Sequence, residues 1–247
     1  MDSVPSSRAG FFGPTGSVVP PVAADRAIYT PLPATDSIAS LDPSDGTIQW
    51  QKTPHEDDSV SVEFNRPAVK DDLIFVTSWP QRVTAYRTDT GVKRWQRELD
   101  EQTLLPPVAT EEGVVVPSRT SVRLLDAADG SDLWNRSLDG NAVESAPAVA
   151  SGTIFVADER EFLHALDLVT GKPLWTLPFD GPTSPVVADD IVYAVRSAVS
   201  LVGIDAKSGE KRFEYQPSQV PLSAPIVGDG VLYVTNRNRV IALEEAT

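Results

Sequence analysis

One pattern recurs five times along this chain: an aspartate, three variable residues, a glycine, three more variable residues and an aromatic residue. The copies occupy residues 42–50, 87–95, 126–134, 167–175 and 205–213, with Arg87 in place of aspartate in the second copy and Phe213 in place of tryptophan in the fifth. A second pattern, a proline ahead of a short apolar stretch, occurs six times, at Pro21, Pro67, Pro107, Pro147, Pro185 and Pro225. These prolines are 46, 40, 40, 38 and 40 residues apart. A repeat of this length predicts a propeller or a solenoid built from similar units.

Each period contains four short segments rich in β-branched and aromatic residues. In the fourth period they read APAV, GTIFVAD, EFLHALDL and KPLWTL, separated by turn-forming residues. Four such segments predict an antiparallel four-stranded sheet, and no stretch has the 3.6-residue periodicity of a helix. Because both faces of such a sheet need cover, we expect radial packing. The predicted fold is all-β: a six-bladed β-propeller forming one domain over residues 1–247, with repeats that begin near residues 19, 65, 105, 145, 183 and 223.

The recurring pattern also assigns a role to its aromatic residue. Aspartate can accept hydrogen bonds from the amides of a tight turn, and glycine supplies the positive φ that the turn demands. The aromatic side chain then stands on the fourth strand, where it can pack against the neighbouring blade. We therefore expect the following residues to be structural contacts between blades rather than ligand-binding groups: Trp50, Trp95, Trp134, Trp175 and Phe213.

The repeat resembles that of the pyrroloquinoline quinone (PQQ)-like propellers. The resemblance rests on the five spaced copies of the pattern and on a small residue ten positions before the aromatic, as in Ala85, Ala165 and Gly203. It covers nearly the whole chain. Because the resemblance implies rings of seven or eight blades for most members, six copies indicate either a smaller ring or a part of a longer chain.

The two ends of the chain predict how the ring closes. The sixth copy ends at residues 240–247, where its turn would begin, so it lacks a fourth strand. Residues 1–18 belong to no full repeat, and the stretch RAGFFGPTG within them resembles the lead-in of archaeal PQQ-like proteins. We expect residues 8–13 to supply the outer strand of the last blade, with Phe11 or Phe12 in place of the absent tryptophan. Deletion of residues 1–18 should then lower the melting temperature.

Composition excludes several classes of partner. The chain has 35 acidic and 21 basic residues and a net charge of −14, which disfavours nucleic acid and anionic membranes. Its preference for Asp and Arg resembles that of proteins from salt-loving archaea. The absence of cysteine excludes disulfides, thiolate nucleophiles and cysteine-bound metals. With no apolar run of membrane-spanning length and no export signal in the given sequence, we expect a soluble monomer.

Residues suited to catalysis are scarce. His164 lies in a predicted strand, and we interpret it as structural. His55 begins a loop that continues with Glu56, Asp57 and Asp58, which could hold calcium but lack the regular alternation and the glycine of calcium loops. No nucleophile, phosphate-binding or zinc motif is present in a suitable context. We expect no metal site, no cofactor and no enzymatic activity.

Arginine recurs in the hairpins between the second and third strands. The residues concerned are Arg82, Arg119, Arg160, Arg196, Arg237 and Arg239, with Trp79 in the same hairpin as Arg82. In an up-and-down sheet these hairpins share one end, and the opposite end collects acidic residues from the first hairpins. Those acidic residues are Asp25, Asp71, Asp72, Glu111, Glu112, Asp189, Asp190 and Asp229. Arginine suits carboxylate and phosphate groups, so this end could bind an anionic ligand or a partner's acidic segment. The alternative interpretation is that the arginines are only solvated hairpin tips.

These observations favour a non-enzymatic propeller that acts as a scaffold and binds a protein or peptide. The resembled family includes the bacterial outer-membrane assembly lipoprotein, although that comparison concerns architecture. One alternative is a PQQ-dependent quinoprotein dehydrogenase, for which the resemblance implies an adjacent-cysteine disulfide, a tryptophan floor and a calcium site that are missing here. The sequence is also compatible with a propeller that binds a small ligand or polysaccharide, and with a domain of a sensor or kinase-linked protein.

Overall fold

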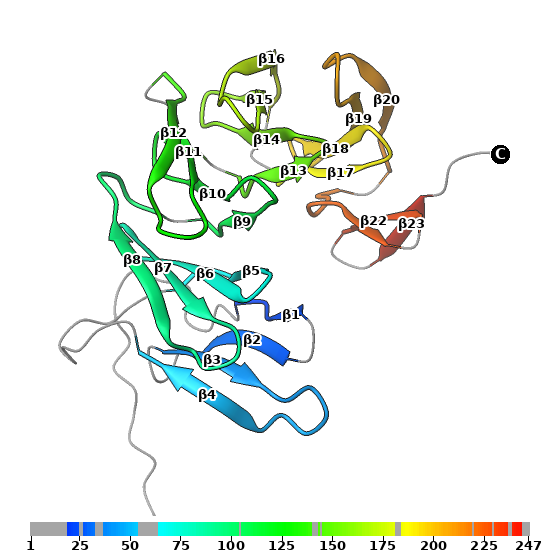
Figure 1. Cartoon of the computed structure of the whole chain (residues 1–247). Coiled ribbons are helices and arrows are strands. Elements are labelled where there is room, and N and C mark those ends of the chain that lie inside the picture. The colour runs from blue at the N-terminus through cyan, green and yellow to red at the C-terminus, as the bar shows by residue number, and fades with distance from the viewer. Residues whose placement is uncertain are drawn as a thin grey trace, which may run out of the picture.

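The computed structural model describes residues 19–24, 27–32, 37–53, 64–103, 105–139, 143, 145–180, 184–218, 220–228, 230–236 and 239–243, and this part of the chain contains no helix. Its 23 strands form six antiparallel sheets, in each of which the strand order follows the chain. Figure 1 shows the sheets as blades around a common centre, with blade one (blue) and blade six (orange to red) at the two ends of the array. The predicted all-β architecture of six blades is confirmed.

The blades follow the predicted repeats. Blade one contains β1 (Val22–Ala24), β2 (Ala27–Leu32), β3 (Ser37–Leu41) and β4 (Ile48–Lys52). Blade two contains β5 (Ala68–Lys70), β6 (Leu73–Ser78), β7 (Arg82–Arg87) and β8 (Lys93–Glu98). Blade three contains β9 (Val108–Ala109), β10 (Val114–Pro117), β11 (Ser121–Leu125) and β12 (Asp132–Ser137). Blade four contains β13 (Ala148–Ala150), β14 (Thr153–Ala157), β15 (Phe162–Asp167) and β16 (Pro173–Pro178). Blade five contains β17 (Val186–Ala188), β18 (Ile191–Arg196), β19 (Ser200–Asp205) and β20 (Lys211–Tyr215), and blade six contains β21 (Ile226–Gly228), β22 (Val231–Thr235) and β23 (Val240–Leu243).

The third and fourth strands of blades one to five share an irregularity. The register shifts by one residue just before the turn, at Ser40/Leu41 in blade one and at Ala85/Tyr86 in blade two. Equivalent shifts occur in the next three blades. A β-bulge of this kind bends the strand and re-aims its side chains. It follows that the third and fourth strands of blades one to five share the same bend before the repeated turn.

The hydrophobic core lies between the blades rather than within one layer. Five clusters of buried apolar residues fill the five boundaries between consecutive blades. At the boundary of blades two and three, for example, Phe75 and Val83 pack with Val114 and Val116, and all four are at most 1% exposed. Because each blade has apolar residues on both faces, it depends on both of its neighbours for cover.

Blade six has three strands in the described part of the chain, as expected from its missing pattern. The segment predicted to close the ring, residues 8–13 within residues 1–18, lies outside the described residues. Closure by this segment therefore stays a prediction. Within the described residues no helix is long and apolar enough to cross a membrane.

Candidate functional site

Four tryptophans each span the boundary between two blades. The ring of Trp50, on β4 of blade one, lies over Gly91 in the β7–β8 turn of blade two, and its indole N–H donates a 2.8 Å hydrogen bond to the carbonyl oxygen of Thr88. A Cβ atom on Gly91 would lie 2.6 Å from Trp50 Cε3, so the ring leaves room for glycine alone. The equivalent bonds join Trp95 to Ala127 (2.9 Å), Trp134 to Leu168 (2.9 Å) and Trp175 to Ala206 (3.0 Å). These four rings are thus engaged in contacts between blades.

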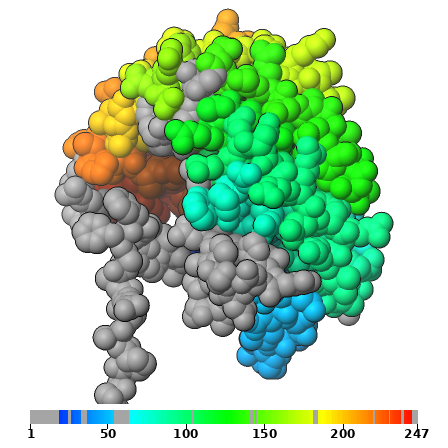
Figure 2. Space-filling model, turned by 90° about the vertical axis from the view of Figure 1, so that its left-hand side faces the viewer, coloured from blue at the N-terminus to red at the C-terminus, as the bar shows by residue number. Residues whose placement is uncertain are grey.

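Phe213 occupies the same position in blade five but has a different environment. Its ring is 38% exposed and lies 6.0 Å from the ring of Tyr193. A phenyl ring has no N–H, so it cannot make the bond that the four indoles make. A cavity of about 780 Å³ separates Phe213 from blade six, and its lining includes Asp190, Asp205, Arg212, Tyr215, Leu232 and Leu243. On the face seen in Figure 2, the surface is also hollowed between blade six (orange to red) and the cyan residues of blade two.

The hairpins between second and third strands lie together with the linkers that connect the blades. The amide of Leu99, which follows blade two, donates a 2.7 Å hydrogen bond to the carbonyl oxygen of Gln81, and Leu138 donates likewise to Thr120 (2.9 Å). Phe179 and Leu222 make equivalent bonds to the hairpins of blades four and five. We call this end of the blades the arginine face; its described hairpin residues are 79–81, 119–120, 159–161, 197–199, 236 and 239.

The structure separates the predicted arginines into two groups. Arg119 and Arg160 are exposed and make no ion pair with a described residue, and the same holds for Arg239. Arg196 is paired with Glu214 on β20 of its own blade, while Arg82 is half-buried. Arg237 lies outside the described residues. Among the described residues, the partial ring expected from the sequence therefore presents three exposed guanidinium groups, those of Arg119 and Arg160 on neighbouring blades and that of Arg239 on blade six.

Trp79 is the one tryptophan of the five that lies on the arginine face. Its side chain is 44% exposed, compared with 8% for Trp50. Two hydrogen bonds anchor the hairpin that carries Trp79 to the linker after blade two. The amide of Thr103 donates a 2.9 Å hydrogen bond to the carbonyl oxygen of Pro80, and the amide of Leu99 donates a 2.7 Å hydrogen bond to that of Gln81. The molecule thus presents a large aromatic ring to solvent on a hairpin anchored at two points.

Two buried charged residues of this region were not predicted from the sequence. Arg123, on β11, is 2% exposed and forms ion pairs with Asp100 (2.5 Å) in the linker after blade two and with Asp132 (3.6 Å) on β12. The hydrogen bond from Arg123 holds the pKa of Asp100 below its ordinary value. Asp158 is 3% exposed and accepts hydrogen bonds from the amides of Arg160 and Phe162, both at 3.0 Å. For Arg123 the sequence offered one signal, a single charged residue inside the strand SVRLL, whereas Asp158 lies in the hairpin after β14 and had no such signal.

His164 takes part in local structure. One ring nitrogen, Nε2, lies 3.0 Å from Asp158 Oδ2, and the other, Nδ1, lies 3.1 Å from Thr176 Oγ1. The carboxylate of Asp158, the imidazole of His164 and the hydroxyl of Thr176 therefore form one hydrogen-bonded chain. His55 and the acidic residues after it, Glu56, Asp57 and Asp58, lie outside the described residues. In the part of the chain that is described, no group of three or more His, Asp or Glu residues could hold a metal ion.

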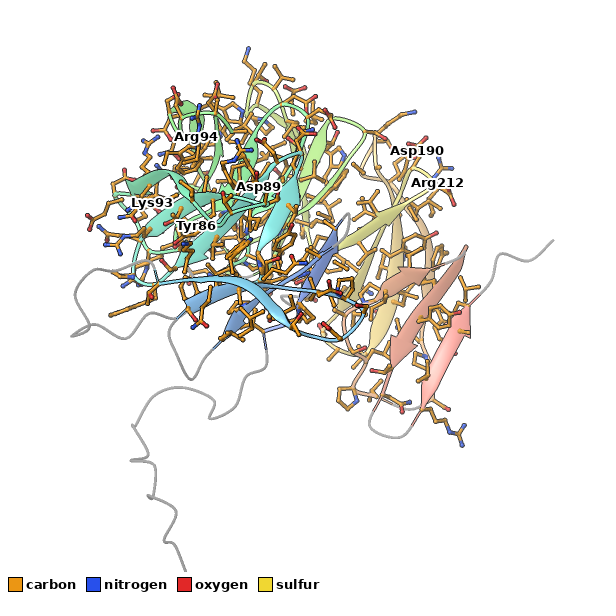
Figure 3. All side chains as sticks on the ribbon, turned by 60° about the horizontal axis from the view of Figure 1, so that its bottom comes forward. Tyr86, Asp89, Lys93, Arg94, Asp190 and Arg212 are labelled. Carbon is orange, nitrogen blue, oxygen red and sulfur yellow. The ribbon has the colours of Figure 1, made fainter. Side chains whose placement is uncertain are left out.

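The opposite end of the blades carries the predicted acidic residues. Asp71, Asp72, Glu111, Glu112, Asp189 and Asp190 are all exposed there, while Asp25 and Asp229 lie outside the described residues. Basic side chains offset part of this charge: Lys70 binds Glu111 at 2.9 Å and Arg87 binds Asp72 at 3.1 Å. Figure 3 shows Asp89 and Arg94 of blade two and, further along the array, Asp190 and Arg212 of blade five.

The repeated turns and radial four-stranded sheets define a β-propeller of the PQQ-like repeat class. The family described as outer membrane protein assembly factor BamB matches residues 34–121 and 118–247, and the chain belongs to this family. BamB of Yersinia pestis is 28% identical over 190 residues, which are 69% of this chain and 48% of that protein. The chain therefore spans about half the length of this relative.

Two solved structures share the fold. BamB from Moraxella catarrhalis superposes with a TM-score of 0.65 at 16% identity, over 92% of this chain and 84% of that one. A quinohemoprotein alcohol dehydrogenase from Comamonas testosteroni superposes with a TM-score of 0.70 at 14% identity, over 83% of this chain and 43% of that one. At these identities the likeness concerns the fold alone.

The residues of this chain do not fit the quinone cofactor of such a dehydrogenase. Four of its five tryptophans are held between blades by bonds from their indole N–H groups, and the fifth, Trp79, lies on a hairpin. The chain has no cysteine, and its described residues include no cluster of donors for calcium. No step of quinone chemistry is derived from this site.

Proposed function

We propose that the chain is a non-enzymatic scaffold that binds a protein partner through the arginine face. Membership of the BamB family supports this proposal, because the relatives of that name are outer membrane protein assembly factors. A propeller of this kind contributes a rigid surface, and its specificity lies in the side chains that the hairpins present.

The observation that carries the proposal is the exposure of Trp79 on an anchored hairpin. Tryptophan and arginine are the residues in which binding energy concentrates at protein interfaces, since both combine a large contact area with a polar group. Trp79 is 44% exposed, and Arg119 and Arg160 follow on the next two blades with exposed guanidinium groups. The hairpin bonds to Thr103 and Leu99 hold this surface in place before a partner arrives, which reduces the entropy lost on binding.

The chemistry of the surface also defines the partner. A guanidinium group matches a carboxylate through two parallel hydrogen bonds, and an indole provides an apolar surface beside it. We infer a partner segment that carries an aromatic or aliphatic anchor next to acidic residues. Such a segment would bind here despite the net charge of −14 because the arginines act at contact distance, whereas the more distant carboxylates are screened by salt.

The experiment compares the wild type with two variants of the full chain in capturing partners from an extract of the source cells. A Trp79→Ala, Arg119→Gln, Arg160→Gln variant should lose the partners that the wild type retains. Arg94→Gln, an exposed arginine near the opposite end, is the matched control and should retain them. Capture at the wild-type level by the triple variant would contradict the proposal, provided that both proteins melt at the same temperature.

A further inference from the structure

The cavity between blades five and six has one wall from each blade. Both walls are mostly apolar and aromatic, and their main side chains are Tyr193, Phe213 and Tyr215 from blade five and Val231, Leu232 and Leu243 from blade six. The cavity volume of about 780 Å³ lies within the range of roughly 300–1,000 Å³ that is typical of sites for small molecules. Its size therefore fits a small organic ligand rather than a folded protein segment.

The aromatic wall is formed by two rings that lie at an angle to each other. A Cβ atom on Gly203 of β19 would overlap the ring of Phe213, so this ring lies directly over the glycine. Its centroid is 6.0 Å from that of Tyr193, and the two ring planes meet at 52°. Because Phe213 lines the cavity and is 38% exposed, the side of its ring away from Gly203 faces the cavity. The two rings thus form one aromatic corner of the site.

The rim of the cavity has an excess of negative charge. Asp189 and Asp190 come from the β17–β18 turn and Asp205 from the end of β19, whereas Arg212 is the single cationic residue among the described residues that line the cavity. Figure 3 shows Asp190 and Arg212 on blade five. Arg212 is already paired with Asp205, and Lys207, which lies 3.5 Å from Asp190, is 81% exposed and neutralises it weakly. The rim therefore favours a cationic ligand over an anionic one.

We propose that this cavity binds a small organic cation, namely a quaternary or alkyl ammonium compound with an apolar substituent. A cation is attracted to the face of an aromatic ring, and this attraction is stronger where the ring is shielded from water. Carboxylates at the rim of a cleft raise the local concentration of cations. The apolar wall of blade six, with Leu232 and Leu243, then receives the substituent and removes it from water.

This site is separate from the arginine face. Asp189 and Asp190 lie in the first hairpin of blade five, and Gly230, which also lines the cavity, lies in the first hairpin of blade six. These hairpins are at the acidic end of the blades, opposite hairpin residues 197–199. Binding of a cation here does not depend on the partner surface around Trp79, so either proposal can fail without the other.

Titration of the full chain with benzyltrimethylammonium tests the proposal. Phenylmethanesulfonate, which has a similar shape and the opposite charge, is the second probe. Nuclear magnetic resonance follows the ring signals of the tyrosines, each assigned with a Tyr→Phe variant. The signals of Tyr193 and Tyr215 should shift with the cation and not with the anion. Those of Tyr29 and Tyr86, which lie at the boundary of blades one and two, should shift with neither probe.

Two changes in the site should weaken binding of the cation. Phe213→Leu keeps an apolar side chain but removes the aromatic face, so the dissociation constant should rise about 2- to 30-fold. A double variant, Asp189→Asn with Asp190→Asn, should weaken binding as well, and this loss should shrink as salt is added. Phe162→Leu on β15 and Glu112→Gln in the β9–β10 turn are the matched controls and should bind as the wild type does.

The aspartate variant changes two exposed side chains, so it tests the site even if Phe213→Leu is unstable. The proposal would be overturned by equal affinity for the two probes, or by wild-type affinity in both site variants. Binding of the cation without a shift at Tyr193 and Tyr215 would place it elsewhere, and no binding of the cation at all would equally refute the assignment.

Discussion

Substitution of Gly91 by alanine isolates the contribution of one contact between blades. Gly91 has a φ of +63°, and the ring of Trp50 lies directly above it. Two costs follow: about 1–2 kcal/mol for a non-glycine residue in the left-handed region, and about 1–3 kcal/mol for a methyl group forced into an occupied space. Gly152→Ala has only the conformational cost, because Gly152 also has a positive φ but no described atom lies within 4 Å of its Cβ position.

The assay is thermal unfolding of both variants beside the wild type. For a domain of this size each kcal/mol lowers the melting temperature by roughly 2–4 °C. We expect a fall of roughly 2–8 °C for Gly152→Ala and a fall larger by roughly 2–12 °C for Gly91→Ala. Equal shifts for the two variants would show that the indole does not press on the turn, and the account of the joint between blades would be wrong.

Three further predictions concern charge and cofactor. Arg123→Met should change the free energy of unfolding little, because the two carboxylate partners of Arg123 are partly exposed and water can hydrate them. Arg123→Ala should lower the free energy of unfolding by about 2–5 kcal/mol, because the smaller side chain leaves a cavity. Chemical denaturation measures both changes. The hydrogen bond from Lys211, together with the charge of Arg196, lowers the pKa of Glu214 to about 2 from its ordinary value of 4.5. The ionised Glu214 therefore stabilises the fold above pH 4.5, and this contribution is lost as the pH falls towards 2. In Glu214→Gln the free energy of unfolding should fall less steeply with pH over that interval. The same dependence of stability on pH in the variant and the wild type would contradict this prediction. Addition of PQQ and calcium should give neither a bound chromophore nor dye reduction, and either signal would restore the dehydrogenase hypothesis.

The repeat allowed the fold to be predicted because each element has a local signal. The glycine of each turn is required by its φ, and the apolar stretches around residues such as Ile154 and Phe155 are long enough to cross a blade and bury both faces. The bounds of the strands follow from these signals to within a few residues. The six-sheet architecture therefore needed no information from distant contacts.

The candidate site could be predicted only in part. Whether each of its arginines is exposed or paired depends on contacts between residues that are distant in the sequence. The pairing of Arg196 on β18 with Glu214 on β20, 18 residues later, depends on how both strands align with β19 between them. The burial of Arg123 depends on Asp100 in the preceding linker. Neither pairing has a signature in the sequence. The sequence alone therefore could not distinguish the exposed Arg119 from the arginines that form ion pairs.

The exchange of the five indole N–H protons with solvent tests the central claim most directly. Nuclear magnetic resonance resolves one indole N–H signal for each tryptophan, and a Trp79→Phe variant assigns the signal of Trp79. If Trp50, Trp95, Trp134 and Trp175 join the blades through bonds of 2.8–3.0 Å, their four protons should exchange slowly and that of Trp79 quickly. Exchange of all five protons at the rate of Trp79 would contradict the account.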